Sequence, residues 1–453
     1  MSAVKQAVWC LVSLSLLTAV GCSSPGGVSR MGYPAVSAIP ATSPEPNLQK
    51  IAHVVIIIQE NRSFDNLFAK YPGADGATKG LLHDGRMFAL IKGPLASKEL
   101  NHTHMGFETE YDGGKMDGFD QIGFGSSGGD GPAGKYPLRY VDPAQIRPYW
   151  EMAQNYALAD HMFQTQGSGS FTAHQDLIAA GTQFAPSESL IDFPSQGPWG
   201  CDAPPGTVTS YITPQGYFYN QGPFPCLTYP TLADLLDPAG VSWRYYTPPL
   251  WVKGSSGFLW NAFDAIDAVR HSRDWKHDDV SPETTIFKDI SAHRLPAVSW
   301  VIPSAPNSDH AAAHDYGPSW VASVVNAIGE SYAWPTTVII VVWDDWGGYY
   351  DHVAPPQLDY QGLGFRVPMI AISPYAKSVG YVSHTQYEFG SIVRFVEHNW
   401  RLGRLGATDV RAASIDDMFD FNQPPRAFVP IKADLPQSFF EHQAPSHEPV
   451  DER

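Results

Sequence analysis

The chain has few charged residues, and the shortage excludes several classes of protein. Only 17% of its 453 residues are charged while 43% are hydrophobic, a balance that excludes intrinsic disorder. The chain has 29 Lys and Arg against 46 Asp and Glu, which gives a formal charge of -17. Because nucleic acids are also negatively charged, a nucleic-acid partner is not expected. The 40 glycines and 39 prolines would interrupt long helices throughout, which excludes a coiled coil.

Long hydrophobic runs are also scarce, and the clearest lies at the amino terminus. Lys5 precedes an uncharged apolar run from Ala7 to Val20, which is shorter than the ~20 residues that span a membrane. A glycine and Cys22 follow, as at the end of a bacterial lipoprotein signal. We therefore predict a lipoprotein-type signal peptide over residues 1–22 and an exported protein anchored to a bacterial membrane through lipidated Cys22. Ordinary secretory cleavage, giving a periplasmic or secreted product, is the alternative.

Cysteine is rare as well. Of the four cysteines, Cys10 lies in the signal and Cys22 would carry lipid, which leaves Cys201 and Cys226. Two cysteines in an oxidising compartment, separated by a stretch rich in Gly, Pro and Tyr, favour a disulfide that closes a surface loop. Two unpaired thiols are the alternative. No CxxC or Cys/His spacing indicates a zinc site.

The rest of the chain is predicted to form one catalytic domain with short extensions. Residues 23–49, rich in Ser, Pro, Gly and Ala, are typical of a flexible tether, residues 50–420 form the domain, and residues 421–453 form a Pro-rich tail. We expect an α/β fold whose central, mostly parallel sheet is flanked by helices, with a loop-rich insert at about 185–262. The expected strands cover 53–59, 297–302, 338–343 and 368–373, and expected helices cover 318–328 and 387–401.

Polar residues with a capacity for chemistry follow two of these strands. The β-branched run that ends at Gln59 is followed by Glu60 and Asn61, and the run that ends at Trp343 is followed by Asp344-Asp345. Ligand sites in α/β sheets lie beyond the carboxyl ends of strands, and carboxylate and amide oxygens suit a divalent cation. Two adjacent carboxylates repel each other unless a cation or a proton intervenes. A helix cap after the first strand and an Asp-rich turn after the second are the alternatives.

Five blocks of sequence occur in a fixed order along the domain. They are Glu60-Asn61-Arg62-Ser63-Phe64-Asp65, Met116-Asp117-Gly118-Phe119, Ser308-Asp309-His310, Asp344-Asp345-Trp346-Gly347-Gly348-Tyr349-Tyr350-Asp351-His352 and Arg366-Val367-Pro368-Met369-Ile370-Ala371-Ile372-Ser373-Pro374. Over roughly residues 50–405 the chain resembles the bacterial phosphoesterase family that groups phosphatidylcholine-type phospholipases C with certain acid phosphatases. The resemblance implies an alkaline-phosphatase-like fold and a metal-assisted hydrolase of phosphate esters with a Ser or Thr nucleophile.

The resemblance also implies roles for individual residues. Glu60 and Asn61 match the family's metal- and phosphate-binding pair, and Asp344 and Asp345 match its second acidic pair. His102, His310 and His314 match histidines that would stabilise charge on the phosphoryl group, one of them acting as general acid.

The nucleophile is placed by the same alignment. Ser170 falls where phospholipase members commonly have Thr, and it would both attack phosphorus and ligate the metal. Ser168 and Thr172 are the alternatives. His174 stands where those members have Arg, and this difference, with Ser in place of Thr, favours phosphatase over phospholipase C slightly.

One divalent metal ion of unknown identity is expected. Oxygen ligands favour calcium, magnesium or manganese, and nearby histidines keep zinc or iron in consideration. A non-catalytic surface lipoprotein that binds glycans or lipids is the alternative to an enzyme. Its binding residues would be aromatics in the middle region, such as Trp199, Tyr217, Tyr219 and Trp251.

Overall fold

A computed structural model describes residues 50–125, 131–250, 252, 255–311, 314–447 and 450. The predicted signal, the tether and Trp251 lie outside the described residues. Among the described residues, none of the helices is both long enough and apolar enough to cross a membrane.

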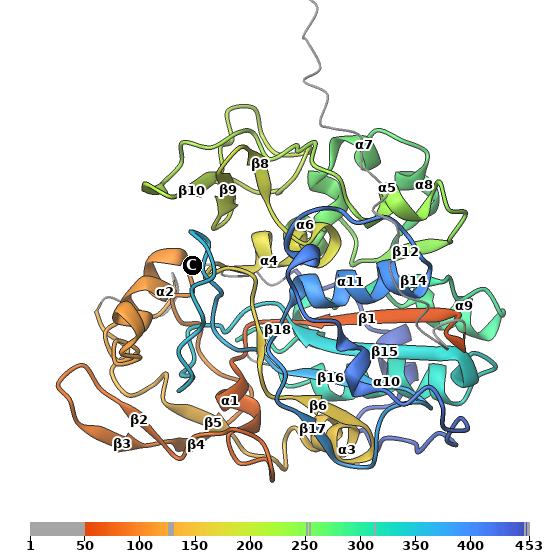
Figure 1. Ribbon diagram of the computed structural model, residues 1–453, viewed down its shortest axis with the longest axis horizontal. Helices are drawn as coiled ribbons and strands as arrows, with labels where there is room; N and C mark the ends of the chain where they lie inside the picture. Colours follow the sequence, from red (N-terminus) through yellow and green to blue (C-terminus); the bar gives the residue numbers. More distant parts are fainter. Residues whose placement is uncertain are drawn as a thin grey trace, which may run out of the picture. The chain divides into compact units, whose positions relative to one another are not determined.

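An eight-stranded sheet forms the centre of the domain (Figure 1). Within it, β12, β14, β1 and β15 run parallel to one another, and β16 is antiparallel to both of its neighbours. The prediction of an α/β fold with a mostly parallel sheet is therefore confirmed. In spatial order the strands are β13 (Asp279–Val280), β12 (Trp243–Tyr246), β14 (Val298–Val301), β1 (His53–Gln59), β15 (Thr337–Trp343), β16 (Met369–Ile372), β6 (Ala157–Ala159) and β17 (Tyr381–Ser383).

The two longest strands lie side by side at the middle of the sheet. In β1 the residues from Val54 to Gln59 are buried, and β15 is buried throughout, as expected for strands covered by helices on both faces. They pair in register from His53 with Thr337 to Gln59 with Trp343, so both strands end at the same level. This register brings the polar residues that follow the two strands together.

Helices cover both faces of the sheet. Figure 1 draws α4 (Ser170–Ala179) and α11 (Phe389–Asn399), which contact each other, above β1 and β15. It draws α3 (Arg147–Asn155) and α10 (Gly317–Gly329), also in mutual contact, below those strands. Every residue of α4 is buried, so this helix is part of the core.

The middle segment, predicted as an insert over residues 185–262, divides into two parts. Its first part contributes to a four-stranded antiparallel sheet of β8 (Gln183–Ala185), β9 (Glu188–Ile191), β10 (Ser210–Thr213) and β11 (Gly216–Phe218). Its second part joins the core, because α5 (Leu232–Leu236) packs on α4 and α11 while β12 enters the central sheet.

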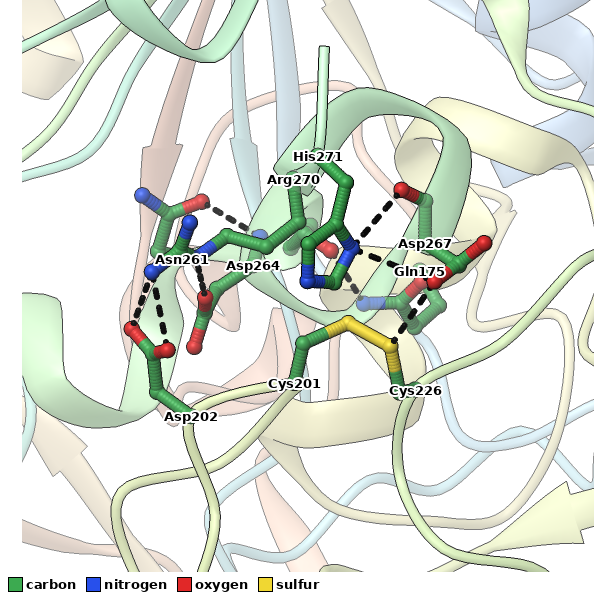
Figure 2. Close-up of a disulfide and its surroundings, with 10 residues drawn as sticks. Gln175, Cys201, Asp202, Cys226, Asn261, Asp264, Asp267, Arg270 and His271 are labelled. Atoms are coloured by element: carbon green, nitrogen blue, oxygen red, sulfur yellow. Dashed lines mark hydrogen bonds and ion pairs between the residues drawn. A yellow bond between two sulfur atoms is a disulfide. The ribbon is translucent and has the colours of Figure 1, made fainter.

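A disulfide connects Cys201 and Cys226, as predicted (Figure 2). Beside it, the backbone N–H of Cys201 donates to the carbonyl of Asp264, 2.8 Å away. Arg270 binds both carboxylate oxygens of Asp202, at 2.8 and 3.0 Å. The segment is thus held to the following helical region by several contacts as well as by the covalent bond.

The carboxyl-terminal segment lies against the domain. Ile431 exchanges hydrogen bonds with the side chain of Asn326 in α10, and the Phe440 ring lies 5.5 Å from that of Trp320. The remaining elements are α1 (Phe64–Phe68), β2 (Lys79–Leu81), β3 (Met87–Ala89), β4 (Ile91–Gly93), α2 (His104–Tyr111), β5 (Arg139–Val141), β7 (Met162–Phe163), α6 (Gly257–Trp260), α7 (Asp267–Arg270), α8 (Asp274–His277), α9 (Thr285–Ser291), β18 (Tyr387–Glu388) and α12 (Gln437–Glu441).

Candidate active site

Hydrogen bonds from backbone N–H groups hold together the residues that follow β1 and β15. The N–H of Asn61 donates to Asp344 Oδ1 at 2.9 Å, and the N–H of Asp344 donates to the last carbonyl of β1, also at 2.9 Å. Glu60, Asn61, Asp344 and Asp345 are all fully buried. The structure therefore brings together the four residues that the sequence placed at the strand ends.

The backbone at this junction is close-packed. Asn61 adopts a left-handed conformation with φ of 60°, which Asn tolerates better than most residues. Gly347 also has a positive φ, and a Cβ atom there would lie 2.1 Å from the carbonyl oxygen of Asn61. At Gly348 a Cβ would lie 2.6 Å from that of Leu100. Both glycines therefore allow close contact between segments of the protein.

Ser170 reaches this cluster from helix α4. It is the first residue of the helix, and its Oγ donates to Asp345 Oδ2 at 3.2 Å. The amino terminus of a helix carries unpaired N–H groups and a partial positive charge, which favour a bound anion. A buried hydroxyl thus meets a buried carboxylate at a site suited to phosphate.

The two alternative nucleophiles have different partners. Thr172 Oγ1 donates to Ser168 Oγ at 2.7 Å, and the same oxygen of Ser168 accepts from the N–H of Asp192 at 2.7 Å. These hydroxyls tie the loop before α4 to the neighbouring segment. Of the three hydroxyl residues, Ser170 is the one whose side chain contacts the acidic pair.

His174 belongs to the same cluster, and the sequence did not predict it as a ligand. It lies one helical turn after Ser170, and its Nε2 is 3.1 Å from Glu60 Oε1 and 3.7 Å from Asp344 Oδ2. The spacing of four residues, which places two side chains on one face of a helix, was the available signal. Glu60, His174 and Asp344 offer ligand atoms within 4.8 Å of one another.

Glu99 connects two of the predicted histidines and is a second residue that the sequence missed. Its Oε1 lies 3.3 Å from His102 Nδ1, and its Oε2 lies 3.0 Å from His310 Nδ1. The Asn61 amide donates to Glu99 at 3.3 Å and lies 3.2 Å from His102 Nε2. His102 Nδ1 also lies 2.8 Å from the Leu100 carbonyl oxygen. Both histidines are therefore buried beside the strand ends, with Glu99 between their rings and the Leu100 carbonyl fixing that of His102. His314 is half-buried, and its ring packs against that of Tyr316 at 5.0 Å.

Aromatic rings form walls around these groups. The Trp260 ring stacks near His174 at 6.4 Å and lies 5.7 Å from the ring of His310. On the other side, the Trp346 ring lies 6.4 Å from that of His102. Both tryptophans are buried, so they lower the local dielectric and strengthen charge interactions within the site.

The donor set fits a divalent cation. Asn61 Oδ1 and Asp344 Oδ2 are buried oxygens to which no group in the described part of the chain donates a hydrogen bond. Buried oxygens without a donor are costly, whereas a cation ligated by carboxylate and amide oxygens removes that cost. Glu60 and Asp345 supply further carboxylates at the same strand ends, and His174 supplies a nitrogen. Such an oxygen set with one imidazole is compatible with several divalent metals.

A buried acid supports the loop that carries His310. Burial raises the pKa of Asp309 to about 6, although the nearby Arg62 guanidinium opposes that shift. The Trp343 indole donates to Asp309 Oδ2 at 2.9 Å, and Arg62 Nε donates to the Asp309 carbonyl at 2.8 Å. These bonds fix the backbone next to His310 against the end of β15.

The family is shown by a match that covers most of the domain. Residues 51–403 match the model described as the Phosphoesterase family. The chain belongs to this family. The matched range includes all of the residues described above, and membership places the chain among phosphoester hydrolases, as predicted.

Curated relatives are consistent with this class. The chain is 26% identical over 466 residues to a non-hemolytic phospholipase C of Pseudomonas aeruginosa, with 89% of this chain and 62% of that protein covered. It is 25% identical over 475 residues to phospholipase C B of Mycobacterium tuberculosis, covering 91% and 86%. The chain thus spans less than two thirds of the length of the first and most of the second.

Solved structures give a weaker similarity. A protein in the alkaline phosphatase superfamily from Vibrio parahaemolyticus matches with a TM-score of 0.37 and 12% identity, covering 84% of this chain and 73% of that one.

Proposed function

We propose that this protein is a metal-assisted phospholipase C that works through a phosphoserine on Ser170. The proposal rests mainly on the contact between Ser170 Oγ and Asp345 at the amino terminus of α4. That contact places a nucleophile, a proton acceptor and an anion-binding helix end at one point.

The metal ligands in this proposal are Glu60, Asn61, Asp344 and Asp345, with His174 added by the geometry. A bound divalent cation would lower the pKa of the serine hydroxyl and offset negative charge on the phosphoryl oxygens. The residues' own part is to hold these oxygens in place, and the hydrogen bond from the backbone N–H of Asn61 to Asp344 Oδ1 fixes one of the carboxylates.

The reaction would proceed in two displacements. Ser170 gives its proton to Asp345 and attacks phosphorus, so the Oγ–P bond forms while the bond from phosphorus to the leaving alcohol oxygen breaks. His102 or His310, which lie on either side of Glu99, donates a proton to that oxygen. Water then attacks the phosphoserine and gives a proton to the histidine that protonated the leaving alcohol. The P–Oγ bond breaks, and Ser170 recovers its proton from Asp345.

A phospholipid is the proposed substrate. The named relatives are phospholipases C, and this chain presents apolar side chains beside its site-bearing loops. Met105, next to buried His104, is 55% exposed, and Tyr219 is 62% exposed. The Tyr217 ring joins them, lying 5.2 Å from that of His104 and 6.2 Å from that of Tyr219. Such a rim suits acyl chains at a membrane surface.

A phosphomonoester is the second candidate, and one observation favours it. His174 occupies the position where phospholipase members carry Arg, and it binds Glu60 instead of extending a guanidinium towards substrate. A smaller substrate would need fewer contacts from this position. Comparing kcat/KM for phosphatidylcholine vesicles and for p-nitrophenyl phosphate distinguishes the two candidates.

The catalytic proposal is tested with Ser170→Ala and, as a matched control, Ser168→Ala. We expect Ser170→Ala to lower kcat on p-nitrophenylphosphorylcholine by roughly 10³-fold or more. In Ser168→Ala, mass spectrometry of quenched reactions should still find a phosphoryl group on Ser170. Full turnover in Ser170→Ala would refute the assignment. Chelation should abolish turnover, and adding back a divalent metal should restore it.

Membrane anchoring belongs to the same proposal. We propose that the mature protein is exported and lipidated at Cys22, which keeps the enzyme at a membrane that holds its substrate. Incorporation of labelled palmitate that disappears in Cys22→Ser supports the anchor, whereas unlabelled protein released in full to the medium or the periplasm contradicts it.

A further inference from the structure

A group of histidines and aspartates lies at the ends of β6 and β17, outside the site described above. Asp160 follows β6 and His384 follows β17, and the parallel pairing of these strands brings the two together. His161 Nδ1 lies 2.8 Å from Asp160 Oδ1, and His384 Nδ1 lies 2.8 Å from Asp160 Oδ2. The Asp160 side chain is fully buried, whereas His384 is 61% exposed, so the group is open to solvent.

His161 is placed between two carboxylates. Its Nδ1 faces Asp160, and its Nε2 lies 3.4 Å from Asp75 Oδ2 on the opposite side of the ring. A neutral imidazole has one N–H, so it can donate to only one of these acids. With the proton on the Asp75 side, Nδ1 presents a lone pair towards Asp160. This carboxylate–imidazole arrangement is the one that orients histidine ligands of metals.

The surroundings carry an excess of negative charge. Arg366 contacts the carboxylates of Asp65 and Asp351, and His352 lies 2.7 Å from Asp65 Oδ2 and 3.2 Å from Asp75 Oδ1. With Asp160, this makes four carboxylates for one guanidinium and one imidazole besides those of His161 and His384. Arg366 binds both oxygens of Asp351, at 2.8 and 3.1 Å, but it meets Asp160 only at the backbone carbonyl. The Asp160 carboxylate accepts a hydrogen bond from the backbone N–H of Asp75 at 2.8 Å, and its described side-chain contacts are with histidines alone.

We propose that Asp160, His161 and His384 bind a zinc ion, distinct from the catalytic metal, with Asp75 orienting His161. One carboxylate oxygen and two imidazole nitrogens are ligands that zinc prefers, and their ligand atoms lie within 4.8 Å of one another. Rotation of the exposed His384 side chain brings the three ligand atoms to separations of roughly 3.3 Å, the distance between neighbouring ligands of a tetrahedral zinc ion. Water completes the coordination. The ion would join the loop after β6 to the loop after β17.

The number of ions bound decides the proposal. Isothermal titration of the purified protein with Zn²⁺ should give one equivalent more for the wild type than for His384→Ala. The matched control is His83→Ala, since His83 is also an exposed histidine whose Nδ1 contacts an aspartate, Asp120, at 2.7 Å. We expect His83→Ala to bind as many equivalents as the wild type. Equal numbers for the wild type and His384→Ala would overturn the proposal.

Two further measurements separate ligation from a structural effect of the variants. Asp75→Asn should keep the ion but weaken its binding about 10- to 100-fold, as loss of an orienting carboxylate does. With Co²⁺ as the probe, the wild type should show a visible absorption band of tetrahedral cobalt that His384→Ala lacks. Hydrolysis of p-nitrophenyl phosphate by His384→Ala at the wild-type rate shows that the catalytic site is intact. A cobalt band that persists in His384→Ala counts against the site.

Discussion

Removing the disulfide offers a quantitative test of how the middle segment is stabilised. Cys201 and Cys226 are 25 residues apart, and closing a loop of that length removes about 12 cal/mol/K of entropy from the unfolded chain. Replacing both by Ser should therefore lower the free energy of unfolding by about 3.5 kcal/mol at 25 °C. With an unfolding entropy of about 0.85 kcal/mol/K for a domain of about 400 residues, Tm should fall by about 4 °C.

The native contacts around the disulfide should survive its removal. Cys201 N–H still donates to the Asp264 carbonyl, and Arg270 still binds Asp202, because neither contact uses a sulfur atom (Figure 2). We therefore expect kcat on p-nitrophenyl phosphate to change less than twofold. Calorimetry of the variant, and of the wild type with and without reductant, measures the effect. A Tm unchanged within 1 °C, or a fall of more than 10 °C with loss of activity, would refute the loop-entropy account.

Three other substitutions test the charges and backbone of the domain. Burial raises the pKa of Glu283 from 4.5 to about 7, so the stability given by its protonated form is complete below pH 4.5 and is lost as pH rises through 7. In urea titrations, Glu283→Gln should therefore be more stable than the wild type by up to about 3 kcal/mol at pH 8 and equal to it at pH 4. The same difference in stability at pH 4 and pH 8 would contradict this expectation. Arg366→Met leaves buried Asp351 without its partner and should cost about 3–5 kcal/mol in urea unfolding, and a loss below 1 kcal/mol would argue against the pair. Gly347→Ala places a Cβ 2.1 Å from the Asn61 carbonyl and should reduce kcat and Tm together; wild-type values of both would refute the close packing.

The sequence predicted the strand ends because their chemistry and their position coincide. The runs ending at Gln59 and Trp343 are apolar enough to be recognised as buried strands, and parallel strands necessarily end at one edge. Glu60 and Asp344 could therefore be placed together from the amino-acid sequence alone. The disulfide was predictable for a different reason, since only two of the four cysteines lie outside the predicted signal peptide.

The rest of the site depends on the path of loops and on helix orientation. Glu99 lies in a stretch without periodicity, so nothing in the sequence indicated that it would lie between His102 and His310. His174 was visible as a departure from the family pattern, but its contact with Glu60 required knowing which face of α4 meets the strand ends. Strand β12 was hidden in the supposed insert because a strand of four residues carries little signal of its own.

The entry of β12 into the central sheet decides which part of the middle segment can be exchanged. Deleting residues 185–262 as a block would expose β14 as an edge strand, with unpaired N–H and C=O groups open to pairing with another chain. It would also remove Trp260 from the wall beside His174. The β8–β11 sheet, by contrast, hydrogen-bonds within itself, so its hairpins can change length without interrupting the central sheet. Changes to the middle segment that are confined to these hairpins should therefore leave the pairing of the central sheet unaltered.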